Sequence, residues 1–139
     1  FQQSKYSPFQ LTDAMLIGDL KRCANIIDQL QQEGVQISQI IWIVHKEIKQ
    51  LHVMKTKLNS GEDIQTLYKE FKIWDKRKPL YSKALSSAKT NNISIALNRL
   101  ISIDHLAKTD RDFDEFFLLK DVMVSLYHGQ QTKQFSLEA

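Results

Sequence analysis

The chain has 139 residues, of which 25% are charged and 42% hydrophobic, so its composition is that of a globular domain and excludes a disordered one. The net charge of +3 indicates only a weak preference for anionic partners. Cys23 is the single cysteine, which excludes a disulfide framework and a multi-cysteine metal site. No apolar run approaches the roughly 20 residues that cross a bilayer, so we expect a cytosolic protein without membrane contact.

Two short helices are expected at the start of the chain. The stretch Leu11 to Ile17 has helical periodicity and stops at Gly18. Asp19 can cap a second helix, which we expect to end at Gly34 in a left-handed conformation. Cys23 falls on the apolar face of that second helix and is interpreted as a small core residue.

The longest expected helix runs from Ile37 to Leu58, with Ser38 as its N-cap. Apolar residues recur along it at spacings of three and four, which is typical of a helix that packs on one side. Trp42 and Ile43 widen this apolar stripe, so we expect several neighbours to enclose the first half of the helix.

Three shorter helices are expected next. Asp63 opens the first of them, and Pro79 suits the first helical position of the second because its missing N–H is not needed there. Asn91 and Asn92 interrupt the pattern before the third. No segment alternates apolar and polar residues over the length of a strand, so we expect no strand.

The last expected helix, from about Phe113 to Tyr127, is apolar around most of its circumference. Its narrow polar stripe consists of Asp114, Asp121, Ser125 and His128. Such a helix must be packed against other residues on most of its sides. One small bundle can bury only part of its apolar surface, so we predict that the rest forms a subunit interface. The candidate interface residues are Phe113, Phe116, Phe117, Met123 and Tyr127.

These patterns together predict an all-α fold, a single bundle of about six to seven helices. We expect residues 1–8 to be the remnant of a linker, residues 9–130 to form the helical domain and residues 131–139 to be a tail. Because Phe1 stands where Met begins a full-length protein, we expect the chain to be a piece of a longer one.

The sequence offers no pattern typical of catalysis or of a bound cofactor. His45 and His52 are seven residues apart and lack the HExxH arrangement of a zinc site, so we expect no metal. There is no glycine-rich phosphate loop, and we expect no nucleotide cofactor.

One basic segment allows two interpretations. Its cations are Lys69, Lys72, Lys76, Arg77, Lys78 and Lys83. With the interleaved aromatic residues Phe71, Trp74 and Tyr81, they could contact phosphates and stack on bases. The other interpretation is a solvated helix junction whose aromatic rings point into the core. We favour the second, because the aromatic positions match the helical stripes.

The sequence also resembles a known family. The stretch PFQLTDAMLIGDLKRCANIIDQLQQEG, the following IIWIVHKEIKQL and the later IWDKRKPLYSKAL are similar to the C-terminal domain of the delta subunit of bacterial DNA polymerase III. The positions that match the family pattern are Asp13, Ala14, Gly18, Lys21, Arg22, Ala24, Ile27, Leu30, Glu33, Gly34, Trp74, Arg77 and Leu85.

The resemblance implies a collar domain without catalytic activity of its own. Members of the family join the gamma or tau and delta-prime subunits in a five-membered clamp-loader ring, which loads the sliding clamp on primed DNA. The clamp-binding and AAA+-like domains would lie upstream, so this stretch would reach the sliding clamp only through them. The resemblance also implies that the protein is bacterial and is located in the cytoplasm, in association with the nucleoid.

The resemblance also suggests a contact with primed DNA. The turn from Thr109 to Phe113 is similar to a region where relatives can offer an aromatic side chain, but here that position carries Arg111. The candidate DNA contacts are therefore Lys76, Arg77 and Arg111. The alternative left open is an unrelated helical adaptor that binds other proteins.

Overall fold

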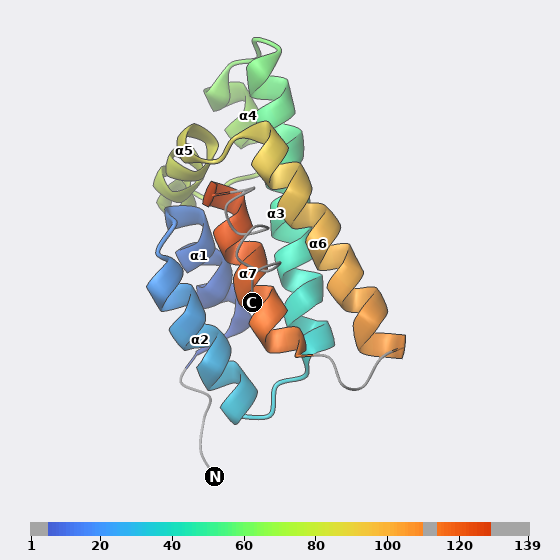
Figure 1. The fold of residues 1–139 in the computed structure, drawn as a ribbon. Helices are drawn as coiled ribbons and strands as arrows, with labels where there is room; N and C mark the ends of the chain where they lie inside the picture. The colour runs from blue at the N-terminus through green and yellow to red at the C-terminus, as the bar shows by residue number, and fades with distance from the viewer. Residues whose placement is uncertain (1–5, 110–113, 129–139) are drawn as a thin grey trace.

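The structure, a computed structural model, describes residues 6–109 and 114–128 (Figure 1). Within these ranges it contains α-helices and one short 3-10 helix but no strand, which confirms the expected all-α class. The elements are α1 (Pro8–Ile17), α2 (Leu20–Gln32), α3 (Ile37–Asn59), α4 (Ile64–Glu70), η1 (Asp75–Arg77), α5 (Lys78–Ser87), α6 (Thr90–Thr109) and α7 (Glu115–His128).

Helix α3 runs along most of the bundle, and the other helices pack around it. Its 23 residues extend about 35 Å at the usual rise per residue. Figure 1 shows α6 alongside α3, and α7 between α6 and the pair formed by α1 and α2. Helix α5 packs against α1 and α3, and α4 lies at one end of the bundle. None of the helices in the described part of the chain is long and apolar enough to cross a membrane.

A single apolar core joins these helices. The fully buried side chains include Leu11 of α1, Ile27 of α2, Ile48 of α3, Leu100 of α6 and Leu126 of α7. All of them come from the stripes of three-and-four spacing that the sequence shows, because only that spacing keeps residues on one side of a helix.

Several expected helix ends are confirmed. Gly18 follows α1 with φ +84°, and Gly34 follows α2 with φ +78°, both in the left-handed region that favours glycine. The Asp19 carboxylate accepts a hydrogen bond from the Arg22 backbone N–H at 3.1 Å and so caps α2. Asp63 caps α4 in the same way.

Helix α1 begins earlier than the sequence pattern indicated. It starts at Pro8 rather than Leu11, with Ser7 as the residue before the first turn. The Ser7 N–H donates to the Gln10 side-chain carbonyl at 2.9 Å, and the Gln10 N–H donates to the Ser7 carbonyl at 3.0 Å. Pro8 therefore belongs to the helix, where its lack of an N–H carries no penalty.

Two other helix starts also differ from expectation. The N-cap of α3 is Gln36, not Ser38, which lies inside the helix. Helix α6 begins at Thr90, so Asn91 and Asn92 occupy its first turn instead of interrupting it. Asparagine is a weak helix former in isolation, but packing against the rest of the bundle overrides local preference.

Trp42 was expected to be enclosed, and this expectation is wrong. Its side chain is 65% exposed, while Ile40, Ile41 and Val44 beside it are buried. A residue two positions before Val44 lies about 200° around a helix from it, so Trp42 faces away from the core. The Lys46 ammonium lies 5.4 Å from the centre of the Trp42 ring and covers part of it.

Candidate interaction surfaces

Helix α7 turns two of the candidate interface residues toward the chain's own core. Met123 is 1% exposed. The half-buried Tyr127 donates its hydroxyl to the carbonyls of Met15 at 2.5 Å and Leu16 at 3.2 Å. A Cβ at Gly18 would lie 3.5 Å from the Tyr127 ring, so the two residues pack closely. Met123 and Tyr127 therefore join α7 to the rest of the bundle rather than face outward.

The other candidates divide by exposure. Phe116 is partly buried and packs against the core. Phe117 is 61% exposed and lies on the outer face of α7. Phe113 lies outside the described residues. Phe117 is therefore the candidate that offers a large apolar side chain to a partner.

A groove runs between α6 and α7. Its volume is about 390 Å³, and Ile103, Leu106 and Leu118 are among the residues that line it. Leu118 follows Phe117 directly along α7. Arg99 and Asp121 also line the groove, so the groove combines apolar walls with the ion pair between these two residues.

The polar stripe expected on α7 is divided, because Asp121 and Ser125 face α6 whereas Asp114 and His128 are exposed. The Arg99 Nη1 donates to the Asp121 Oδ2 at 2.8 Å and to the Ser125 Oγ at 2.7 Å, and Ser125 is fully buried. Burial raises the pKa of Asp121, and the charge of Arg99 opposes this rise only in part. Helix α6 therefore covers the part of the polar stripe that Asp121 and Ser125 form.

A second surface is the turn between α4 and α5. The Ile73 N–H donates to the Tyr68 carbonyl at 2.9 Å, and Lys72 before it has φ +54°. Trp74 follows in an extended conformation and is 71% exposed. The expectation that the aromatic rings of this segment point into the core holds for the fully buried Tyr81 but is wrong for Trp74.

The charges around Trp74 are unevenly paired. Glu70 pairs with Lys57 at 2.8 Å, and Asp75 pairs with Lys78 at 2.8 Å. Within the described part of the chain, the exposed lysines of this segment whose ammonium groups have no such partner are Lys69, Lys72, Lys76 and Lys83. The acidic residues of the turn are thus neutralised locally, and an excess of positive charge faces water.

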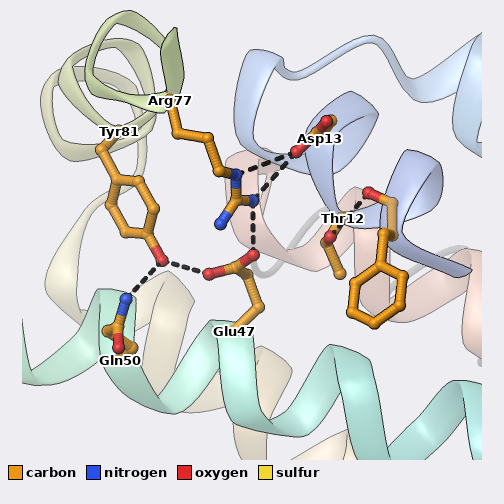
Figure 2. A network of polar contacts seen from close by, with 7 residues as sticks. Thr12, Asp13, Glu47, Gln50, Arg77 and Tyr81 are labelled. Atoms are coloured by element: carbon orange, nitrogen blue, oxygen red, sulfur yellow. Dashed lines mark hydrogen bonds and ion pairs between the residues drawn. The ribbon is translucent and has the colours of Figure 1, made fainter. Parts of the chain in front are cut away.

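Arg77, a candidate DNA contact, is already engaged inside the protein (Figure 2). Its Nε and Nη2 donate to the Asp13 Oδ1 at 3.1 and 2.9 Å, and its Nη2 also donates to the Glu47 Oε1 at 2.6 Å. The Tyr81 hydroxyl donates to the Glu47 Oε2, and the Gln50 Nε2 donates to the Tyr81 oxygen at 2.9 Å. Lys76 is exposed, and Arg111 lies outside the described residues.

Sequence reasoning could not find this network because its members are far apart in the chain. Arg77 lies 64 residues from Asp13 and 30 from Glu47. Burial lowers the pKa of the Arg77 guanidinium, but the hydrogen bond and charge of Glu47, together with the charges of Tyr81 and Asp13, raise it, so that the net pKa is raised. Burial, followed by the charge of Glu47, raises the pKa of Tyr81 above its usual range.

No geometry typical of a reactive centre is seen among the described residues. They contain no group of three or more His, Cys, Asp or Glu side chains placed to hold a metal ion. Cys23 is 1% exposed, and burial raises the pKa of its thiol to about 12. What the described residues offer is a helical bundle with two outward surfaces, one at Phe117 on α7 and one at Trp74 between α4 and α5.

Comparison with known proteins identifies the family. The family model described as "Processivity clamp loader gamma complex DNA pol III C-term" matches residues 8–127. The DNA polymerase III subunit delta of Haemophilus influenzae is 27% identical over 133 residues, which cover 90% of this chain and 39% of that protein. Its counterpart in Escherichia coli is 23% identical over 123 residues, which cover 88% of this chain and 36% of that protein.

The chain belongs to the family of C-terminal domains of DNA polymerase III delta subunits. It spans less than two-fifths of the length of the two relatives. Membership excludes the unrelated helical adaptor that the sequence alone left open, because the match extends from the first turn of α1 to the end of α7.

Proposed function

We propose that this chain is the oligomerisation domain, or collar, of a clamp-loader delta subunit. It joins gamma or tau and delta-prime subunits in the ring that loads the sliding clamp on primed DNA. The domain carries out no catalysis, and the sliding clamp is reached through other parts of the same protein. Such a protein works in the bacterial cytoplasm close to the nucleoid.

The observation that supports this proposal is the exposed Phe117 on α7, the helix that forms one wall of the groove. An apolar side chain with 61% of its surface exposed is a suitable anchor for a partner, because large side chains near a pocket supply much of the binding energy of an interface. Leu118, the next residue along α7, lines the groove together with Ile103 of α6. Membership of the clamp-loader family supports a partner subunit as the occupant.

Co-elution of the purified full-length protein with gamma or tau and delta-prime subunits tests the proposal. We expect Phe117→Asp to weaken assembly about thirtyfold, the equivalent of a hot-spot loss of about 2 kcal/mol. Phe9→Asp is the matched control, because Phe9 is 66% exposed on α1, away from the groove. Assembly unchanged by Phe117→Asp, or equally weakened by both variants, would contradict the proposal.

A contact with primed DNA is the second candidate function, favoured by the exposure of Trp74. Aromatic rings stack on unpaired bases, and nearby cations attract the phosphates. Trp74 lies between Lys72 and Lys76, which are both exposed. The ring of Trp42 is covered in part by Lys46, whereas no cation lies over the Trp74 ring in the described part of the chain.

The test of this contact is the affinity for a labelled primed DNA with a single-stranded overhang. We expect Trp74→Ala to weaken binding about tenfold, since stacking of one base contributes about 1–3 kcal/mol. Trp42→Ala removes an equally exposed tryptophan and should leave the affinity unchanged. Lys76→Glu should also weaken binding and reduce its salt dependence. Equal affinities of the wild-type and Trp74→Ala proteins would argue against the contact.

A further inference from the structure

Arg77 lies at the point where three parts of the bundle meet. Its guanidinium contacts Asp13 of α1 and Glu47 of α3, while its backbone ends η1 directly before α5 (Figure 2). It also lies over the Tyr81 ring, with 5.6 Å between the guanidinium carbon and the ring centre. A residue tied to two other helices fixes the position of the backbone that carries it.

The backbone fixed in this way is the turn that presents Trp74. The Trp74 carbonyl accepts the N–H of Arg77 at 2.9 Å and the N–H of Lys78 at 3.1 Å, so one tight turn connects Trp74 to Arg77. On the other side of Trp74, the Ile73 N–H is held by the Tyr68 carbonyl at 2.9 Å. Trp74 itself contributes nothing to the core, since 71% of its surface is exposed. Its position therefore depends on the anchors that flank it.

Glu47 is the stronger of the two carboxylate anchors. Its side chain is 11% exposed, against 48% for Asp13. Its second oxygen accepts the Tyr81 hydroxyl, and Tyr81 is fully buried. Ion pairs that are shielded from water and held by further hydrogen bonds are more rigid than exposed pairs. Substitution of Arg77 should therefore disturb the position of the turn most, substitution of Glu47 less, and substitution of Asp13 least.

We propose that Arg77 is a positioning residue for Trp74: anchored mainly on Glu47, it holds the turn in the arrangement that presents the Trp74 ring and Lys76 to a nucleic acid. The nucleic-acid part of this inference rests on the DNA contact proposed above. Arg77 then contributes to DNA binding through the turn and not by touching phosphate. Lysine at this position would not replace it, because an ammonium lacks the planar fork that reaches two carboxylates at once.

The fluorescence of Trp74 allows the turn to be followed directly. The chain contains two tryptophans, so a Trp42→Phe background leaves Trp74 as the only one in the 139-residue chain. In this background we would measure the fluorescence anisotropy of Trp74, its quenching by acrylamide, and the affinity for the labelled primed DNA. The variants are Arg77→Met, Arg77→Lys, Glu47→Gln and Asp13→Asn.

We expect Arg77→Met to lower the anisotropy of Trp74 and to weaken DNA binding about fivefold, less than complete loss of the stacking contact. Glu47→Gln should have a similar but smaller effect, and it tests the same link if the arginine variant does not fold. Arg77→Lys should resemble Arg77→Met. Asp13→Asn should change both readouts least.

Arg99→Met is the matched control, because Arg99 is also partly buried and paired with a carboxylate, but on α6 and α7. It should lower the melting temperature without changing the anisotropy of Trp74. Unchanged Trp74 anisotropy in both Arg77→Met and Glu47→Gln would overturn the positioning role, and so would weaker DNA binding without any change at Trp74. If the anisotropy changes while no variant, Trp74→Ala included, alters DNA affinity, the positioning of Trp74 stands and the DNA contact fails.

Discussion

At the scale of single residues, α7 shows that a helix with apolar residues on most sides can still be used mainly by its own bundle. Met123 and Phe117 differ by six positions in the same helix, yet one is 1% exposed and the other 61%. The two residues therefore belong to different functions. Met123 stabilises the fold, and Phe117 is available to a partner.

This difference in exposure predicts that two alanine substitutions change the free energy of unfolding to very different extents. Met123→Ala should lower the free energy of unfolding by about 2–5 kcal/mol, because it leaves a cavity in the core. Phe117→Ala should change it by less than about 0.5 kcal/mol. Urea unfolding followed by circular dichroism measures both. Equal destabilisation by the two substitutions would show that α7 is packed differently.

Cys23 gives a prediction about pH. Burial, with a smaller effect of Asp19, raises the pKa of its thiol from the ordinary 9.0 to about 12. Between these two pKa values, the thiol stays neutral in the folded protein but is ionised in the unfolded chain. The stability that Cys23 contributes is complete below pH 9 and is lost as the pH rises toward 12.

Urea unfolding at pH 8 and at pH 10.5 would check this linkage. Between these values the wild-type protein should lose more unfolding free energy than Cys23→Ala, which has no thiol to ionise. Iodoacetamide should alkylate the native protein at pH 8 far more slowly than the urea-unfolded one. A native thiol that reacts as fast as the unfolded thiol would contradict the buried position.

At the scale of elements, the contact between α6 and α7 combines apolar packing with one partly buried ion pair. Arg99 supplies donors to both Asp121 and Ser125, and the Ser125 hydroxyl also donates to the Asp121 carbonyl at 2.8 Å. The groove that we assign to a partner lies along the same two helices. The pair therefore maintains the shape of the groove.

Removal of the cation should destabilise this contact. Arg99→Met should lower the free energy of unfolding by about 1–3 kcal/mol, because a partly buried carboxylate loses its charged donor. Thermal unfolding of the variant measures the loss. Lys57→Met, which breaks the exposed pair with Glu70, should have little effect and serves as the control. A melting temperature unchanged by Arg99→Met would show that the ion pair between Arg99 and Asp121 does not stabilise the fold.

The elements themselves could largely be predicted from the sequence, because both the helical stripes and the caps at Asp19 and Asp63 are local signals. The burial of individual aromatic residues could not be predicted from the sequence. Trp42 and Trp74 are large apolar residues of the kind that usually lie in a core. Packing between distant segments decides which side of a helix or turn is covered, and the local sequence does not show this. The same limit applies to Arg77, whose anchors cannot be found by local spacing.

At the scale of the whole molecule, the positive charge is concentrated in one part of the chain. Residues 46–89 hold eleven Lys and Arg against five Asp and Glu, a net +6, whereas the rest of the chain holds eight against eleven, a net −3. The positive stretch includes α4 and α5, and Figure 1 shows that α7 begins near the end of the bundle away from α4. A partner subunit at Phe117 and a nucleic acid at Trp74 would thus occupy different regions of one domain.

Site-specific photocrosslinking tests the central claim, that Phe117 faces a neighbouring clamp-loader subunit. Benzoylphenylalanine would replace Phe117 in the full-length protein and, in a separate control, the equally exposed Phe9. After reconstitution with gamma or tau and delta-prime subunits, we expect position 117 to crosslink to one of these subunits and position 9 to give little product. A reconstituted complex in which position 117 gives no crosslink to any subunit would contradict the assignment.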